Sequence, residues 1–473
     1  MISFQSEDGC PLGVLLLKRR CRKEDCNRRS MSRKNTVACG FSQSLMENTL
    51  QMKTNYFNLK RGPVYAVALG FFGVLAGQGL LAQESIRPSS TGDMAAEARR
   101  EVVLPTNYNI KAGPLLLDLT GRLEIEANDN VGLSETDREF DVIVRPEIRF
   151  NSFWQITRFN TLELSIGLGF AKYLLNTSAD TSGVLVDPGT QISFDFYVGN
   201  WRINLHDRFA VLQNPIDEIG LSGVANFDRI QNAIGVQAVG DYNDMMVVLG
   251  YDHYNFWSLS GEFEYLDRAE EQVYASVSFD VSSAHRVGVD LHGSFVNYDQ
   301  DFNNDGTTYG AGVFWEVTLS NYIKMRIAGG YQGMSFDGGG ANGDSGDYNG
   351  YYANFMISQR LNAYWTHALT AGHEARLGLS VNYDEFDYAR YNATWAFSSK
   401  FSLGMNAFVE NSNESTGFAS ESSFRLGGGF SFGYQINRRT ALTFAYQYVN
   451  KDSDEEFRSY YQNRAVIGIS YDF

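Results

Sequence analysis

The sequence predicts an all-β protein: a closed, transmembrane, antiparallel up-and-down β-barrel of about 18 strands, with about 16 as the alternative. Three observations predict this fold. Apolar residues alternate with polar or small ones, short turns alternate with long polar connections, and the alternation continues to Phe473. In a strand, such alternation produces one apolar face and one polar face. A tilted strand of about ten residues is long enough to cross the hydrocarbon of a bilayer.

The composition agrees with a strand-rich chain. Aromatic residues make up 14% of the sequence, and 46 glycines accompany only 8 prolines, so strand formers are common and strand breakers are rare. The mean hydropathy of −0.27 does not exclude a membrane protein, because half of each barrel strand faces water. The length of 473 residues permits either one large barrel or about two or three smaller domains.

The first 82 residues differ from the rest and are expected to lie outside the fold. Residues 1–51 are basic, and we interpret them as an artefactual or non-structural extension ahead of a start at Met52, with an unusually long leader as the alternative. Residues 52–82 have the three parts of a cleaved signal peptide. These are a basic segment, the apolar run Val64–Leu81 and a small residue, Ala82.

Charge and cysteine content limit the ligands that we expect. All four cysteines lie in the first 40 residues. Cys21 and Cys26 could supply half of a metal site, but no second pair or nearby histidine completes it. The net charge is −16, and it becomes more negative once the basic residues 1–82 are removed, which argues against a nucleic-acid partner. We therefore expect no metal and no cofactor.

Alternating segments follow one another through residues 115–473, the expected barrel. Apolar stripes lie at 117–125, 140–150, 162–170, 192–198, 201–209, 273–279, 287–291, 313–317 and 323–327. Short turns are expected at 199–200, 282–283, 320–321, 361–362, 398–399 and 436–437. Long polar loops are expected at 128–138, 176–189, 299–307, 337–349, 411–421 and 450–457. A barrel that keeps its short turns on one side produces this alternation.

The tryptophans support the same arrangement. All except Trp257 lie within a few residues of an expected short turn: Trp154, Trp201, Trp315, Trp365 and Trp395. Because indole side chains prefer the membrane–water interface, this distribution predicts an aromatic girdle on the short-turn side.

Residues 115–473 resemble bacterial outer-membrane β-barrels of the porin type, nearest to the β-barrel porin (type 2) family. The signal peptide, the segment Asn204–Arg208 within a hairpin, the loop motif Asn342–Asp347 and the terminal strand carry this resemblance. It implies an outer-membrane location in a Gram-negative-type bacterium, with residues 83–114 as a short periplasmic segment. Such families are named by architecture, so the function has to be argued from the residues.

The terminal strand resembles the sorting signal of such barrels. Its apolar face consists of Ala465, Ile467, Ile469, Tyr471 and Phe473. We expect this strand to bind the barrel-assembly machinery and to close the barrel by pairing with the first strand near 117–125. The last strand of a soluble β-sandwich is the alternative for this segment taken alone.

Alternation also predicts which side chains face the interior. The candidate pore-lining residues are Asp195, Arg202, Asn204, His206, Arg208, Arg145, Arg149, Glu316, Lys324 and Arg326. Charges of both signs suit the wall of a water-filled channel through which small hydrophilic solutes or ions diffuse passively. The alternative is a solvated inner face whose charges pair with one another and select nothing.

Other functions find less support in the sequence. Asp301–Gly306 matches the start of a calcium loop, but Gly312 occupies the position that should hold a bidentate glutamate. The six histidines, among them His253 and His373 near expected strand ends, form no catalytic motif, so no enzyme activity is expected.

A non-conducting structural, adhesin or receptor barrel is the alternative function. Modest loops and the lack of a plug-sized domain favour the channel. Outer-membrane lipid is an expected partner, and the acidic loops should concentrate cations at the mouth. The oligomeric state is left open.

Overall fold

The computed structural model describes residues 93–99, 108–181 and 183–473, all within one compact unit that comprises residues 64–473. The predicted extension 1–51, the predicted signal peptide 52–82 and the four cysteines lie outside the described residues. No helix within the described ranges is long and apolar enough to cross a membrane.

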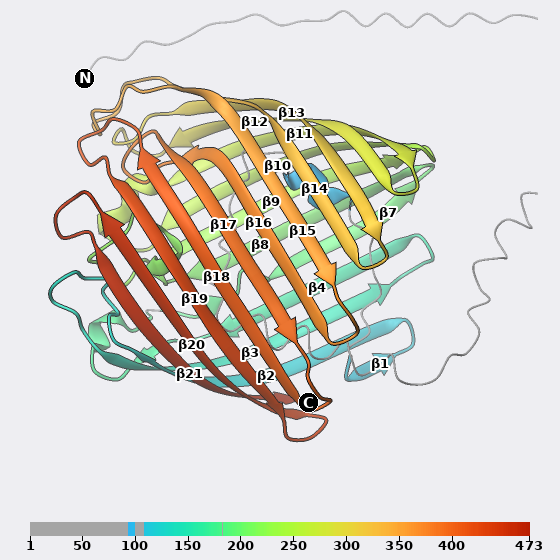
Figure 1. The fold of residues 1–473 in the computed structure, drawn as a ribbon, viewed down its shortest axis with the longest axis horizontal. Coiled ribbons are helices and arrows are strands. Elements are labelled where there is room, and N and C mark those ends of the chain that lie inside the picture. Colours follow the sequence, from blue (N-terminus) through green and yellow to red (C-terminus); the bar gives the residue numbers. More distant parts are fainter. Residues whose placement is uncertain (1–92, 100–107, 182) are drawn as a thin grey trace, which may run out of the picture. The chain divides into compact units, whose positions relative to one another are not determined.

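Eighteen long strands form a closed antiparallel barrel, which confirms the predicted fold and strand number (Figure 1). These strands are β2 (Leu115–Asn128), β3 (Asp141–Gln155), β4 (Asn160–Gly169), β7 (Gln191–Val198), β8 (Trp201–Leu212), β9 (Arg229–Asp241), β10 (Met245–Ser258), β11 (Arg268–Ser282), β12 (His285–Tyr298), β13 (Gly306–Ser320), β14 (Ile323–Phe336), β15 (Tyr348–Arg360), β16 (Trp365–Leu377), β17 (Tyr383–Trp395), β18 (Phe401–Glu414), β19 (Ser422–Gln435), β20 (Thr440–Ser453) and β21 (Tyr460–Asp472).

Short elements accompany the barrel strands. They are α3 (Asp93–Ala98), β1 (Ile110–Ala112), β5 (Lys172–Tyr173), β6 (Leu185–Val186) and the 3₁₀ turns η2 (Thr177–Ala179), η3 (Pro215–Asp217) and η4 (Gly261–Leu266).

The barrel closes where β2 pairs with β21. The register runs from Thr120 opposite Asp472 to Asn128 opposite Arg464, and the Phe473 N–H donates to the Leu119 carbonyl at 3.0 Å. The predicted closing pair is therefore confirmed, but its register begins at Thr120. Leu117 instead pairs with Ile110 of β1, which extends the edge of β2 beyond the reach of β21.

The two faces of each strand differ as the alternation predicts. On β21, Ile467, Ile469 and Tyr471 are exposed, whereas Val466 and Ser470, which alternate with them, are buried. The same contrast recurs on β12, where Val289 and Leu291 are exposed and Asp290 between them is buried. Closed pairing satisfies the backbone of every strand, so the apolar outer surface can face lipid.

Short turns and long loops occupy opposite ends of the barrel. The short turns are 156–159, 199–200, 242–244, 283–284, 321–322, 361–364, 396–400 and 436–439, which confirms each predicted turn to within a few residues. Gly199 permits the two-residue turn between β7 and β8 because its φ of 62° lies in the left-handed region. The long loops are 129–140, 170–190, 213–228, 259–267, 299–305, 337–347, 378–382, 415–421 and 454–459.

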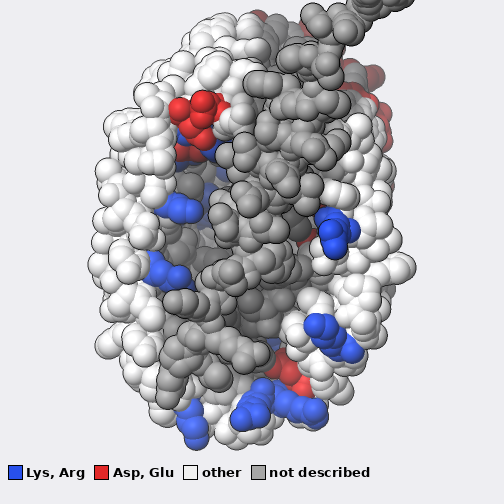
Figure 2. Space-filling view, turned by 90° about the vertical axis from the view of Figure 1, so that its right-hand side faces the viewer, with Lys and Arg blue, Asp and Glu red and all other residues white. Residues whose placement is uncertain are grey.

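The short-turn end is aromatic and basic. Five of the six tryptophans lie close to its turns, as predicted, and Trp257 lies near the other end of β10. Figure 2 looks onto this end and shows Lys and Arg side chains around its rim. Exposed basic residues in or beside the short turns are Arg158, Lys324, Arg360, Lys400, Arg438 and Arg439.

Candidate functional site

The loop 213–228 between β8 and β9, here called the crossing loop, reaches strands that are not its neighbours in the barrel. Arg425 Nη1 on β19 donates to the Ile216 carbonyl at 2.6 Å. Ser222 Oγ donates to the Arg458 carbonyl at 2.8 Å and accepts from Lys451 Nζ at 3.1 Å. Because β19, β20 and the approach to β21 lie on another side of the barrel, the crossing loop spans the interior at the long-loop end.

Apolar side chains anchor both parts of the crossing loop. Phe227 is fully buried against Phe256 and Phe263, with Leu221 and Leu266 in the same cluster. Ile216 packs with Leu133, Val449 and Tyr460 at the far side. Each large apolar side chain buried in this way stabilises the loop by about 1.5–3 kcal/mol. The loop is thus a fixed part of the long-loop end of the barrel.

Two ionisable groups at the long-loop end have pKa values shifted by burial. Burial raises the pKa of the Asp228 carboxyl, although a hydrogen bond from Asn226 and the charge of Arg229 lower it. Burial also raises the pKa of the Tyr265 hydroxyl in η4, which lies within hydrogen-bond distance of Ser380 Oγ at 3.3 Å.

Carboxylates that each hold two cationic groups line one side of the interior. Glu126 on β2 pairs with Arg145 and with Arg464, the latter at 3.0 Å. Glu410 on β18 pairs with Arg390 at 2.9 Å and with Arg425, whose Nε donates at 2.8 Å. A third carboxylate has the same arrangement: Glu421 pairs with Lys451 at 2.7 Å and Arg458 at 3.2 Å. Within these clusters, cationic groups outnumber carboxylates.

Four of the predicted pore-lining residues come together on β7 and β8. Asn204 Nδ2 donates to Ser193 Oγ at 2.7 Å, and His206 Nδ1 lies 2.9 Å from Asn204 Oδ1. Asp195 lies 3.9 Å from Arg202 Nε. The His206 Nε2 atom lies 2.5 Å from Asp252 on β10, a partner that the sequence did not identify.

The other predicted residues occupy separate positions. Arg149 pairs with Glu147 at 2.9 Å and with Asp187. Arg145 belongs to the Glu126 cluster. Arg208 lies 3.7 Å from Glu97 of α3, and Arg326 lies 3.7 Å from Glu316. Lys324 is exposed at the short-turn end, where no other described residue forms an ion pair with it. A common solute path for these residues remains a prediction.

Helix α3 lies against the inner side of β9, β10 and β11 (Figure 1). Ala95 and Ala98 are buried in a cluster with Val239, Val248 and Tyr274. Arg202 donates to the Ala98 carbonyl. The sequence predicts residues 83–114 to be a short periplasmic segment, and the described part of that segment includes this helix on the barrel wall.

The loop with the calcium-like pattern uses its polar groups within the protein. Asn304 Nδ2 donates to Asn382 Oδ1 at 2.7 Å and to the Asp344 carbonyl at 2.8 Å. Asn303 Nδ2 donates to the Leu379 carbonyl at 3.1 Å, and Asp305 Oδ1 accepts from the Tyr298 N–H at 2.7 Å. These bonds join several long loops, which gives Asn303, Asn304 and Asp305 a structural role.

The two histidines near the strand ends pair with carboxylates other than their sequence neighbours. His253 Nδ1 lies 2.9 Å from Glu271 on β11, and His373 Nδ1 lies 2.8 Å from Asp387 on β17. His373 also stacks on Tyr351, which is an exposed outward residue. These pairs are therefore cross-strand contacts on the outer surface.

Sequence reasoning missed the crossing loop and the partners Arg99, Asp252 and Asp290. A usable signal existed for the crossing loop, because Ile216, Ile219 and Leu221 are apolar residues beside Pro215 and Gly220, which interrupt a strand. No comparable signal marks the carboxylate partners, since pairing between distant strands depends on the register of the whole barrel.

The closed barrel, its apolar outer belt and its charged inner wall define the class of this protein, a transmembrane antiparallel β-barrel. No known family model matches the chain, and no curated protein sequence matches it. The type 2 family itself therefore remains an expectation.

Several solved structures align with most of this chain, at very low sequence identity and with TM-scores below 0.5. OpdK of Pseudomonas aeruginosa with vanillate is 9% identical, with a TM-score of 0.44, and the match covers 76% of this chain and 99% of that one. A BenF-like porin from Pseudomonas fluorescens Pf-5 is 9% identical, with a TM-score of 0.46 and the same coverage. OccK2 of P. aeruginosa in complex with glucuronate is 10% identical, with a TM-score of 0.45, covering 76% and 98% of the two chains.

Proposed function

We propose that this protein is an outer-membrane channel through which small hydrophilic solutes or ions diffuse passively, with no enzymatic activity and no cofactor. The observation that carries the proposal is the contrast between the two faces of the barrel wall. Apolar side chains cover the outside, whereas clusters such as Arg145–Glu126–Arg464 line the inside. Charged groups on the inner wall of a closed barrel favour a water-filled interior over a packed apolar core.

The proposed orientation places the short-turn end in the periplasm and the long loops outside the cell. The tryptophans near the short turns would then lie at the inner headgroup region. Export would use the predicted signal peptide 52–82. The outward face of β21, which ends at Phe473, would bind the assembly machinery, and outer-membrane lipid would surround the apolar belt.

The crossing loop and α3 give the alternative function a specific basis. Both occupy part of the interior, and many inner charges are already paired, as in the Arg425–Glu410 contact. A barrel obstructed in this way would serve as a structural or receptor protein that does not conduct. The acidic long loops favour cations, whereas the cationic clusters inside favour anions. The sign of the selectivity therefore has to be measured.

Single-channel recording in planar bilayers tests the proposal. Folded protein, identified by its shift on unheated gels, should produce discrete conductance steps in potassium chloride. Reversal potentials in a salt gradient would then give the ion preference. A control preparation unfolded by heating should produce no steps. Correctly folded barrels that insert but never conduct would reject the channel and favour the structural alternative.

A further inference from the structure

Arg99, which directly follows α3, occupies a cradle formed by neighbouring barrel strands. Its Nη1 donates to Ser276 Oγ on β11 at 2.9 Å and lies 3.7 Å from Asp290 Oδ1 on β12. Its Nη2 donates to Glu316 Oε1 on β13 at 2.9 Å. Only 4% of the Arg99 side chain is exposed. The barrel wall therefore binds a guanidinium group with two carboxylates and a hydroxyl.

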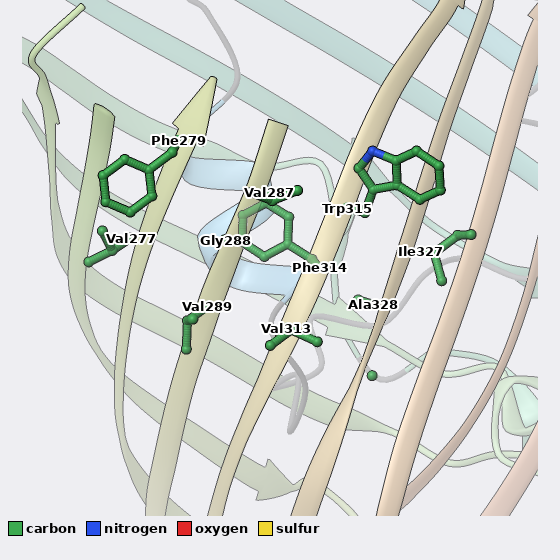
Figure 3. Close-up of a pocket in the computed structure, with 11 residues that line it drawn as sticks. Val277, Phe279, Val287, Gly288, Val289, Val313, Phe314, Trp315, Ile327 and Ala328 are labelled. Atoms are coloured by element: carbon green, nitrogen blue, oxygen red, sulfur yellow. The ribbon is translucent and has the colours of Figure 1, made fainter. Parts of the chain in front are cut away.

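An aromatic ring completes the cradle. The guanidinium carbon of Arg99 lies 4.3 Å from the centroid of the Phe314 ring. This ring packs over Gly288, where a Cβ atom would come within 2.4 Å of it (Figure 3). Gly288 thus leaves the space that the ring occupies. A planar cation over an aromatic face and between carboxylates suits a guanidinium better than an ammonium, because only the guanidinium is planar.

The wall residues of the cradle carry one negative charge more than positive. Arg326 on β14 donates to Asp290 Oδ2 at 3.2 Å and lies 3.7 Å from Glu316 Oε1. Arg286 lies opposite Glu316 in the register, but it is paired with Asp280 at 2.7 Å. One guanidinium of the wall therefore faces two carboxylates, and Arg99 supplies the cation that balances them.

Among the described residues, Arg99 makes more polar contacts with the wall than α3 itself does. Its buried residues, Ala95 and Ala98, are small, and its six-residue length is too short for a helix that is stable by itself. Two arginines of β8 add polar contacts, one to the Ala98 carbonyl and one to Glu97. Arg99 is thus a guanidinium group that the chain itself holds in a site built by three wall strands.

We infer that the cradle of Ser276, Asp290, Phe314 and Glu316 is a binding site for a guanidinium compound such as free arginine, and that Arg99 is its internal competitor. The inference goes beyond passive diffusion and does not require the barrel to conduct. A tethered competitor acts at an effective concentration of about millimolar, so it lowers the apparent affinity of the wild-type protein for free ligand.

Equilibrium dialysis of radiolabelled L-arginine against the folded full chain in detergent tests the inference. Arg99→Ala should bind arginine at least about tenfold more tightly than wild type, because the competitor is gone. Adding Glu316→Gln to that variant should abolish the gain in affinity for arginine. Adding Phe314→Leu should reduce that affinity about fivefold. Arg360→Ala, which removes an exposed arginine at the short-turn end, is the matched control and should bind as wild type does.

Citrulline separates guanidinium recognition from general adsorption, because it has nearly the shape of arginine but no charge. It should not bind to Arg99→Ala. The inference is overturned if Arg99→Ala binds arginine no more tightly than Arg360→Ala, if citrulline binds equally well, or if Glu316→Gln leaves the gain intact. A gel shift on heating verifies that each variant is folded. Dialysis involves no ion flow, so a barrel that binds arginine but does not conduct would reject only the proposed channel.

Discussion

The crossing loop and α3 both occupy the barrel interior, but they are held there by different forces. The crossing loop buries large side chains, including Phe227 and Ile216, in two apolar clusters. Helix α3 buries two alanines and is held mainly by polar contacts of Arg99, Arg202 and Arg208. Apolar burial is not weakened by charge screening or by competing ions, whereas a salt bridge can exchange its partner for a free ion. The loop should therefore behave as fixed structure and the helix as an exchangeable element.

The largest expected effect comes from removing the main apolar anchor of the crossing loop. Phe227→Ala should destabilise the docked loop by about 3–5 kcal/mol, because it leaves a cavity among Phe256, Phe263 and Leu266. Limited proteolysis should then cut within 213–228, and single-channel conductance should rise. Phe418→Ala, which removes a side chain that is 87% exposed in another long loop, should change neither. Unchanged proteolysis in Phe227→Ala would show that the polar contacts alone hold the loop.

The second effect concerns the polar anchor at the far end of the same loop. Arg425→Met removes the donor to the Ile216 carbonyl and one of the two cations on Glu410. Loss of a partner from a buried ion pair costs about 3–5 kcal/mol, and here Arg390 compensates part of it. The temperature at which the gel shift is lost should fall. Proteolysis within 213–228 should increase, but less than in Phe227→Ala. Arg438→Met, an exposed residue of a short turn, is the control and should leave that temperature unchanged.

A smaller effect is expected for the anchor of α3. Arg99→Met should release the helix while the barrel remains folded, because the wall strands pair with one another independently of it. Single-channel conductance should rise. The variance of the open-channel current should depend less on ionic strength than in wild type, because the salt-sensitive contact of the helix is absent. Arg360→Met serves as the control. A large loss of barrel stability in Arg99→Met would contradict the distinction between fixed loop and exchangeable helix.

The outer face of the barrel could be predicted from the sequence, and the inner contacts could not. Alternation alone is enough to place Ile467 and Ile469 outward, because a strand has only two faces. It also places Asp195, Arg202 and His206 inward, but it cannot supply Asp252 as the partner of His206, which depends on the register of β8, β9 and β10.

The crossing loop and α3 were harder still to predict. Several of their contacts join segments more than 100 residues apart, as in the bond between Arg425 and the Ile216 carbonyl or between Arg99 and Ser276. Periodicity describes a segment and its immediate neighbours, so it contains no information about which distant wall an inserted loop or helix will contact. The short turns could be predicted from the sequence because each depends on a few adjacent residues, such as Gly199 and Asn200.

The smallest effect should come from Gly288, which does not contact α3 itself but packs under the Phe314 ring. A Cβ added there would lie 2.4 Å from that ring and 2.6 Å from the Val277 carbonyl oxygen, so both the ring and the backbone must shift. Gly288→Ala should therefore cost about 1–3 kcal/mol of strain and weaken the contact between Phe314 and Arg99. Gly293→Ala on the same strand meets its nearest atom at 3.4 Å and is the matched control. If Gly288→Ala raises arginine binding part of the way toward Arg99→Ala while Gly293→Ala does not, the helix depends on the aromatic face as well as on the carboxylates. If arginine binding instead falls, the ring contributes more to the free ligand than to Arg99.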